Sequence, residues 1–231
     1  MDANITFDEK RTYTDWGLKV TTVRIGLPAP VVKKVEIPGR DGALDLTEWA
    51  GRVNYSKREV EIGLVGFGDH ESWHQQVSRI AAYLHGAKRK MTLDSEPDHY
   101  YLGRFEIDTV KENEYVHEYS IAGTVEPFKY ECISSVEPWK WDSFNFETGV
   151  IREYGGIRVD GEKVLIIPGT SMPVVPVIVT DSEMEVHFNE AVYPLGEGEN
   201  RVYGIQLLQG ENELTFIGTG TVSVDYRGGT L

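Results

Sequence analysis

The sequence is poor in cysteine and has no long apolar run. Cys132 is the single cysteine among 231 residues, which excludes an internal disulfide and any zinc or iron–sulfur site built from several cysteines. No apolar run approaches the roughly 20 residues that a membrane-spanning helix needs. The first residues, MDANITFDEK, carry acids where a signal peptide has a positive segment. We therefore expect a soluble protein that is made in the cytoplasm and does not enter a membrane.

Basic residues are also few. The chain has 23 Lys and Arg against 37 Asp and Glu, a formal net charge of −14. This balance lacks the positive field that sequence-specific or nonspecific binding to nucleic acid requires, and an anionic membrane surface would repel it. Hydrophobic residues make up 40% and charged residues 26%, which is typical of a folded globular protein.

The residues that are abundant predict a mainly β protein. Glycine and proline, 24 and 10 residues, interrupt short runs rich in Val, Ile, Thr and aromatic residues. Apolar and polar residues alternate within five of these runs, which predicts strands with one buried face. The runs are residues 18–23, 60–64, 105–110, 184–188 and 222–226.

One segment, residues 70–85, has helical periodicity instead. Its apolar residues form a single stripe at spacings of three and four: Trp73, Val77, Ile80, Ala81 and Leu84. Asp69 is a suitable N-cap, and Gly86 stands where a C′ glycine ends a helix. We expect this helix to cover a sheet or the mouth of a barrel.

The sequence predicts two domains, residues 1–131 and 132–231. The first has 17 basic and 22 acidic residues, and the second has 6 and 15. The second contains no helical window and is expected to fold from short strands as a β-sandwich. It also contains a repeated tripeptide, Gly198-Glu-Asn200 and Gly210-Glu-Asn212, which predicts two turns with positive-φ residues.

Two local patterns are candidate functional sites. His70, Glu71 and His74 match the H-E-x-x-H pattern of zinc peptidases, but His70 would lie in the fraying first turn of the helix. A third ligand is also lacking nearby, since His85 would lie about 16 Å from His74 along a helix. The second pattern is a rigid turn that presents a charged pair, and we expect it to contact a partner chain. Its residues are Pro38, Gly39, Arg40, Asp41 and Gly42.

Taken in order, several segments make the chain similar to the distal tail proteins of phages and prophages with long, non-contractile tails. These segments are Asp15-Trp-Gly-Leu18, residues 37–45, the strand at 55–65, the helix ending at Gly86, residues 93–104, Glu126-Pro-Phe-Lys-Tyr130, and residues 208–214, 218–222 and 226–231. The resemblance implies an N-terminal split β-barrel-like domain that bears the helix and a C-terminal galectin-like β-sandwich. It implies no catalytic residues and no cofactor.

The same resemblance implies a virion structural protein of the tail tip. Six copies would close into a hub ring that joins the tail tube to baseplate or receptor-binding proteins around the DNA channel. The N-terminal domain would form the ring and the C-terminal domain would dock partners. The acidic composition leads us to expect carboxylates at the channel, along which DNA passes without binding.

Two other functions remain open from the sequence. A carbohydrate-binding protein would stack a sugar on an exposed aromatic residue, for which Trp139 and Trp141 are candidates. The zinc peptidase, with His70, Glu71 and His74, is the other. Either would require features that the resemblance does not imply.

Overall fold

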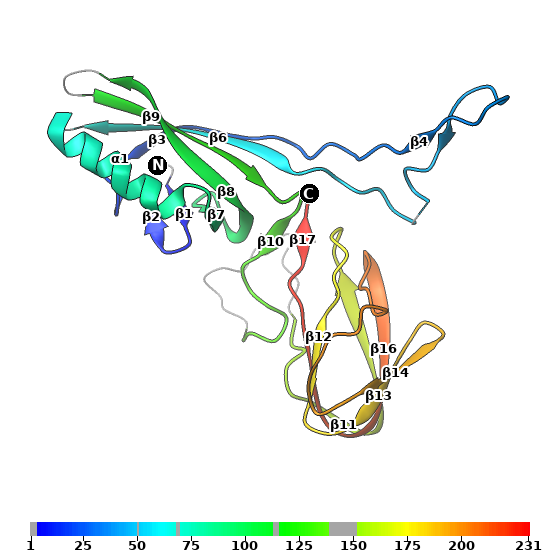
Figure 1. Cartoon of the computed structure of the whole chain (residues 1–231). Helices are drawn as coiled ribbons and strands as arrows, with labels where there is room; N and C mark the ends of the chain where they lie inside the picture. Colours follow the sequence, from blue (N-terminus) through cyan, green and yellow to red (C-terminus); the bar gives the residue numbers. More distant parts are fainter. Residues whose placement is uncertain (1–3, 50, 68–69, 113–115, 139–151) are drawn as a thin grey trace. The chain divides into compact units, whose positions relative to one another are not determined.

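A computed structural model describes residues 4–49, 51–67, 70–112, 116–138 and 152–231 (Figure 1). The described residues are mainly β with one helix, which confirms the predicted fold class. The chain forms two compact units. Unit 1 comprises Met1–Glu96 and Tyr100–Lys129, and unit 2 comprises Pro97–His99 and Tyr130–Leu231.

Unit 1 is built on one antiparallel sheet in which the strands follow the order β2-β1-β7-β8-β9-β6-β3. β6 pairs with β9 over ten positions, and β8 and β9 form a long hairpin. A separate two-stranded ribbon pairs β4 with β5. The elements are β1 (Ile5–Phe7), β2 (Lys10–Arg11), β3 (Lys19–Ile25), β4 (Lys34–Val35), β5 (Leu44–Asp45), β6 (Arg58–Phe67), α1 (His70–Leu84), β7 (Lys88–Leu93), β8 (Glu96–Glu112) and β9 (Val116–Val125).

Helix α1 covers one face of this sheet, as its apolar stripe predicts. Trp73, Ile80 and Leu84 are buried in the core of unit 1, and Val77 and Ala81 pack against it. The helix ends at Leu84, one residue earlier than expected, and is followed by Gly86 with a φ of 72°. The proposed N-cap, Asp69, lies outside the described residues.

The opposite face of the sheet carries polar side chains. Along β6, Val60, Ile62 and Leu64 are buried beneath the helix, whereas Glu59 and Glu61 are exposed. This is the alternation expected of an antiparallel sheet with one wet face. The strand predictions for residues 18–23, 60–64 and 105–110 fall within β3, β6 and β8, with β3 beginning one residue later.

Unit 2 contains a sheet of six strands in which β16 is central. The order is β14-β13-β16-β12-β15, and β11 pairs with β16 along thirteen positions. The predicted strands at 184–188 and 222–226 correspond to β13 and to the end of β16. The elements are β10 (Lys129–Glu131), β11 (Ile157–Gly169), β12 (Val177–Thr180), β13 (Met184–Phe188), β14 (Ala191–Leu195), β15 (Gly198–Asn200), β16 (Gly210–Asp225) and β17 (Gly229–Thr230).

The expectation of short strands alone in this unit is wrong, because β11 has 13 residues and β16 has 16. Two glycines explain why β16 looks interrupted in the sequence. Gly218 and Gly220 lie where β16 stops pairing with β13 and begins to pair with β12. A Cβ at Gly218 would meet the Cβ of Met184 at 2.6 Å, and one at Gly220 would meet Ser182 Oγ at 2.2 Å. Glycine therefore permits a close approach here without ending the strand.

Candidate functional site

The possible zinc motif lies at the start of α1. The side chains of His70 and Glu71 lie outside what the structure describes. His74 is exposed, and its ring lies 4.2 Å from that of Trp73, which in turn lies 5.4 Å from the ring of the buried His117. Among the described residues, no group of three His, Cys, Asp or Glu side chains could hold a metal ion.

Trp139 and Trp141, the aromatic residues considered for sugar stacking, also lie outside the described residues. Within the described part, no helix is both long and apolar enough to cross a bilayer.

The most distinctive surface of unit 1 is a long two-stranded extension, residues 26–57, which we call the arm. It continues the β3–β6 hairpin beyond the sheet and carries β4 near its end (Figure 1). Backbone hydrogen bonds connect its two strands along their length. Ser56 donates to the Ala29 carbonyl (2.8 Å), Val31 donates to that of Asn54 (2.7 Å), and Leu46 donates to the carbonyl of residue 33 (2.7 Å).

Side chains also order the outer part of the arm. The Lys33 N–H donates to Thr47 Oγ1 (3.1 Å), and the Thr47 N–H donates to Asp45 Oδ1 (2.9 Å). Hydrogen bonds from the Thr47 hydroxyl and backbone lower the pKa of Asp45, because they favour its charged form. The arm is thus a defined structure, although it has no core of its own.

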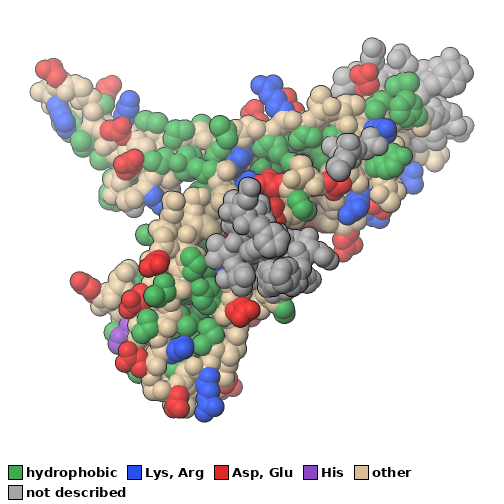
Figure 2. Space-filling view, turned by 180° about the vertical axis from the view of Figure 1, so that it is seen from behind, with side chains coloured by type: hydrophobic (Ala, Val, Ile, Leu, Met, Phe, Trp, Pro, Cys, Tyr) green, Lys and Arg blue, Asp and Glu red, His purple; other side chains and the backbone are tan. Residues whose placement is uncertain are grey.

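Apolar side chains are exposed along the whole arm. None of the residues in the buried core of unit 1 comes from the arm. Figure 2 shows hydrophobic side chains along the arm between charged ones. Six large apolar side chains are between 41% and 86% exposed: Leu27, Val31, Val32, Val35, Ile37 and Trp49. A two-stranded ribbon is marginally stable alone in water, and several large exposed apolar side chains on one ribbon are characteristic of an interaction site.

The turn predicted to contact a partner lies at the end of the arm. The Arg40 N–H donates to the Ile37 carbonyl (3.1 Å), and Gly39 has a φ of 83°. This is the geometry expected of a type II turn with Pro38 in its second position. Every residue from 38 to 42 is exposed. Arg40 and Asp41 make no ion pair within the described part of the chain.

The sequence indicated the turn but not the arm that supports it. Pro28 and Pro30 interrupt the strand pattern, because proline has no N–H to donate to a ladder. A signal was nevertheless present. Residues 27–32 are all apolar, without the alternation of a half-buried strand, as expected of an exposed ribbon with apolar side chains.

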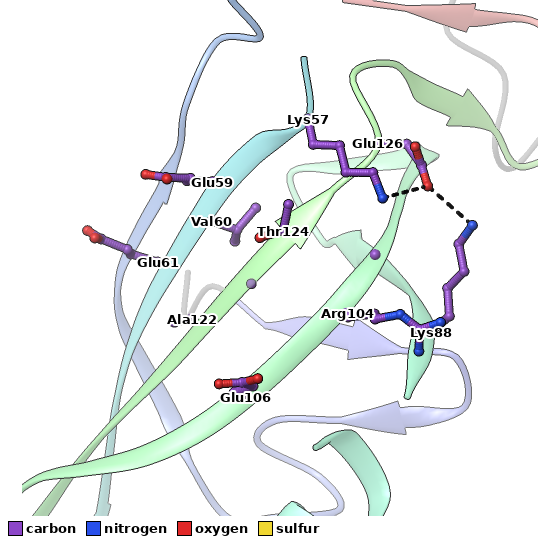
Figure 3. A pocket seen from close by; sticks show the side chains of 12 residues that line it. Lys57, Glu59, Val60, Glu61, Lys88, Arg104, Glu106, Ala122, Thr124 and Glu126 are labelled. Carbon is purple, nitrogen blue, oxygen red and sulfur yellow. Dashed lines mark hydrogen bonds and ion pairs between the residues drawn. The ribbon is translucent and has the colours of Figure 1, made fainter. Parts of the chain in front are cut away.

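The open face of the unit 1 sheet contains a shallow groove of about 540 Å³ (Figure 3). At one end, Lys57 and Lys88 both form ion pairs with Glu126, at 3.5 and 3.2 Å. Across its floor, Glu61 on β6 and Glu106 on β8 are the register neighbours of Ala122 on β9. The small central residue leaves space between two exposed carboxylates. Arg104 also lines the groove, so it is a polar surface of four glutamates and three basic residues, without an apolar pocket for a small ligand.

Comparison with known proteins shows that this fold also occurs in a solved phage protein. No protein-family model and no curated protein matches the sequence. The chain is similar to a solved structure, that of the Dit (gp 19.1) protein of phage SPP1, whose description calls it a paradigm of the hub adsorption apparatus in phages that infect Gram-positive bacteria. The two share 17% sequence identity with a TM-score of 0.60, and the match covers 99% of each chain. At this identity, the likeness shows a shared fold.

Proposed function

We propose that the protein is a structural component of the tail tip of a phage or prophage with a long, non-contractile tail. The observation that carries this proposal is the end-to-end fold likeness to SPP1 Dit, which leaves neither chain with an unmatched domain. In this role, the chain forms a hexameric hub ring around the DNA channel. The ring connects the tail tube to baseplate or receptor-binding proteins, and the chain performs no catalysis.

The arm supplies the self-association that a ring requires. A closed ring is built from one heterologous contact repeated by rotation, so each copy must present a projecting surface and a receiving one. The arm is a projecting surface with exposed apolar side chains, such as Val35 and Ile37, and with the turn from Pro38 to Gly42 at its end. Covering these side chains with another copy would bury the apolar area that a lone ribbon cannot bury.

The open sheet face carries carboxylates of the kind expected at the wall of a DNA channel, and two of the three basic residues in its groove, Lys57 and Lys88, are ion-paired with Glu126. Glu59, Glu61 and Glu106 are exposed on one face. Tight contacts to phosphate need Lys or Arg, because affinity comes largely from releasing the counterions of DNA. A wall rich in carboxylates would therefore let DNA pass without binding it.

The test is direct imaging of the protein and of the particle that contains it. Electron microscopy of the purified chain should show rings with sixfold symmetry, and light scattering after size exclusion should give six times the monomer mass. Antibodies against the chain should label the distal end of the tail. A protein that stays monomeric at high concentration, together with unlabelled tails, would contradict the proposal.

A further inference from the structure

Unit 2 has a sheet face that is turned away from its core, which we call the outer face. It is formed by the outward side chains of β11, β16, β13 and β14. Residues directly opposite each other in antiparallel strands point to the same side of a sheet. The register therefore places ten side chains in three adjacent rows: Glu162, Ile217, Glu185 and Pro194; Val164, Thr215, His187 and Val192; Ile166 and Glu213.

Four aliphatic side chains on the outer face are exposed. Val164 and Ile166 follow each other on the outward side of β11, Ile217 is the diagonal neighbour of Val164, and Val192 lies in the row of Val164 beyond Thr215 and His187. Their exposed fractions are 44% for Val164, 55% for Ile166, 53% for Val192 and 37% for Ile217. Their inward neighbours along the strands, such as Leu165 and Leu214, form the buried core. The solvent-facing side of this sheet thus mixes exposed aliphatic side chains with polar and charged ones.

The charges that surround these aliphatic residues have one sign. Glu162 and Glu185 flank Ile217 within its row, and Glu213 lies opposite Ile166. The rows also contain the imidazole of His187, whose Nε2 lies 3.9 Å from Glu185 Oε2. The rows contain no Lys or Arg. Arg158 is outward-facing on β11 but lies two rows beyond Glu162.

The exposed aliphatic side chains and the surrounding carboxylates together indicate what kind of surface this face could bind. If two copies of the chain met through this face, their glutamates would be brought together, and like charges at an interface oppose association. A surface with Lys or Arg set between aliphatic side chains would instead pair with the carboxylates and cover the aliphatic residues. We propose that the outer face docks a different protein of the particle through such a basic and aliphatic surface. This inference rests on the proposed tail-tip function and names the surface and the partner chemistry of its docking domain.

Strand propensity offers a competing explanation, because β-branched residues are common in strands even when exposed. The variant Val164→Thr with Ile166→Thr separates the two explanations. It retains β-branching at both positions but replaces a methyl group at position 164 and an ethyl group at position 166 by a hydroxyl. If strand propensity explains why these residues are aliphatic, unit 2 of the variant should fold as before and still dock. If the apolar surface explains them, docking should weaken.

The experiment supplies the chain in trans to a phage whose genome lacks it and counts infectious particles. The test variant is Glu162→Lys with Glu185→Lys. The matched control is Glu197→Lys with Glu199→Lys, which changes the charge equally at exposed positions around β15, at the far end of the sheet order. Because like-charge contacts cost several kcal/mol, we expect the test variant to yield about 100-fold fewer infectious particles and the control to match wild type. The Thr variant should lie between them.

Further results support or overturn this assignment. Both purified charge variants should retain the wild-type unfolding transition and oligomer mass, and suppressors that replace Lys or Arg by Asp or Glu in another particle protein would support the assignment. Normal particle numbers with the test variant would overturn it. Loss of self-association by that variant would also overturn it, because the face would then join copies of the chain. If wild type itself does not restore particles, the proposed function fails first.

Discussion

Asn200 and Asn212 make the same hydrogen bonds in two turns that lie twelve residues apart. Each Oδ1 accepts from the backbone N–H four residues earlier, at 2.9 Å. Each Nδ2 donates to the carbonyls four and two residues earlier, and also to the carbonyl directly opposite on the neighbouring strand. That opposite carbonyl belongs to Ile178 for Asn200 and to Ile167 for Asn212. The repeated tripeptide is thus a repeated turn, with a positive-φ glycine in both copies.

Replacing these asparagines should destabilise unit 2. Asn212 is buried, so Asn212→Ala leaves several backbone groups without a partner and should lower the free energy of unfolding by about 1–3 kcal/mol. Asn200→Ala should cost less, because water reaches that turn. Urea unfolding measures both values. Asn212→Asp is the control that keeps the accepting oxygen and loses the donor, and full recovery of stability by Asp would contradict this account.

The apolar surface of the arm should drive association between copies. Val35→Glu with Ile37→Glu places charges where the proposed ring buries apolar area, so the dissociation constant should rise at least about tenfold. Both side chains are exposed, so the unfolding temperature should hardly change. Light scattering over a concentration series measures the association. Tyr203→Glu with Leu231→Glu is a matched control on exposed positions of unit 2, and an equal loss of association there would contradict a specific role of the arm.

Stability should fall in alkaline solution through two buried tyrosines. Burial raises the pKa of Tyr119 and of Tyr226 from 10.0 to about 12. The unfolded chain therefore loses these protons at a lower pH than the folded chain does. The contribution of the protonated tyrosines to the free energy of unfolding is complete below pH 10 and is lost as the pH rises towards 12. Each tyrosine accounts for at most about 2–3 kcal/mol.

Urea unfolding at pH 8 to 11.5, combined with phenolate absorbance, tests this pH dependence. Tyr119→Phe should lower stability at neutral pH, since it removes a weak contact to Gln76 (3.4 Å), and should flatten part of the alkaline decline. Tyr226→Phe loses the hydrogen bond to the Pro168 carbonyl (3.2 Å) and should flatten the rest. An unchanged decline in the double variant would assign it to other groups.

Reversing charge on the open face of unit 1 should create affinity for DNA. In the assembled protein, Glu61→Lys with Glu106→Lys replaces two carboxylates by ammonium groups in every copy. Binding to duplex DNA should then appear at low salt and weaken steeply as salt rises, because it depends on counterion release. Fluorescence anisotropy with a labelled duplex measures it. Glu190→Lys with Glu197→Lys on unit 2 is the control, and equal binding by that variant would mean that charge anywhere on the chain suffices.

The helix and its boundaries could be predicted from the sequence because local signals agreed there. Trp73, Ile80 and Leu84 form one stripe, and Gly86 supplies the left-handed residue that follows the last turn. The alternating strands were predictable for the same reason, since burial on one face leaves a period of two in the sequence.

The arm and the long strands of unit 2 could not be predicted, because long-range pairing decides them. In the sequence, Pro28 and Pro30 indicate the end of a strand. In the structure, Pro30 forms a bridge with Tyr55 on the opposite strand of the arm. Gly218 and Gly220 resemble turn residues in the sequence, but they lie where one edge of β16 changes its partner from β13 to β12 while the other edge stays paired with β11. In both cases, local propensity indicates an interruption and tertiary contacts override it.

The arm contributes no residue to the hydrophobic core cluster of unit 1, so selection on the arm and selection on the core can act separately. Substitutions or changes of length between residues 26 and 57 leave the interior and its folding almost untouched. The contact with other chains can therefore diverge quickly while the scaffold is conserved. Two such proteins could keep the same architecture after nearly all detectable sequence likeness had been lost, and each would still recognise its own copies.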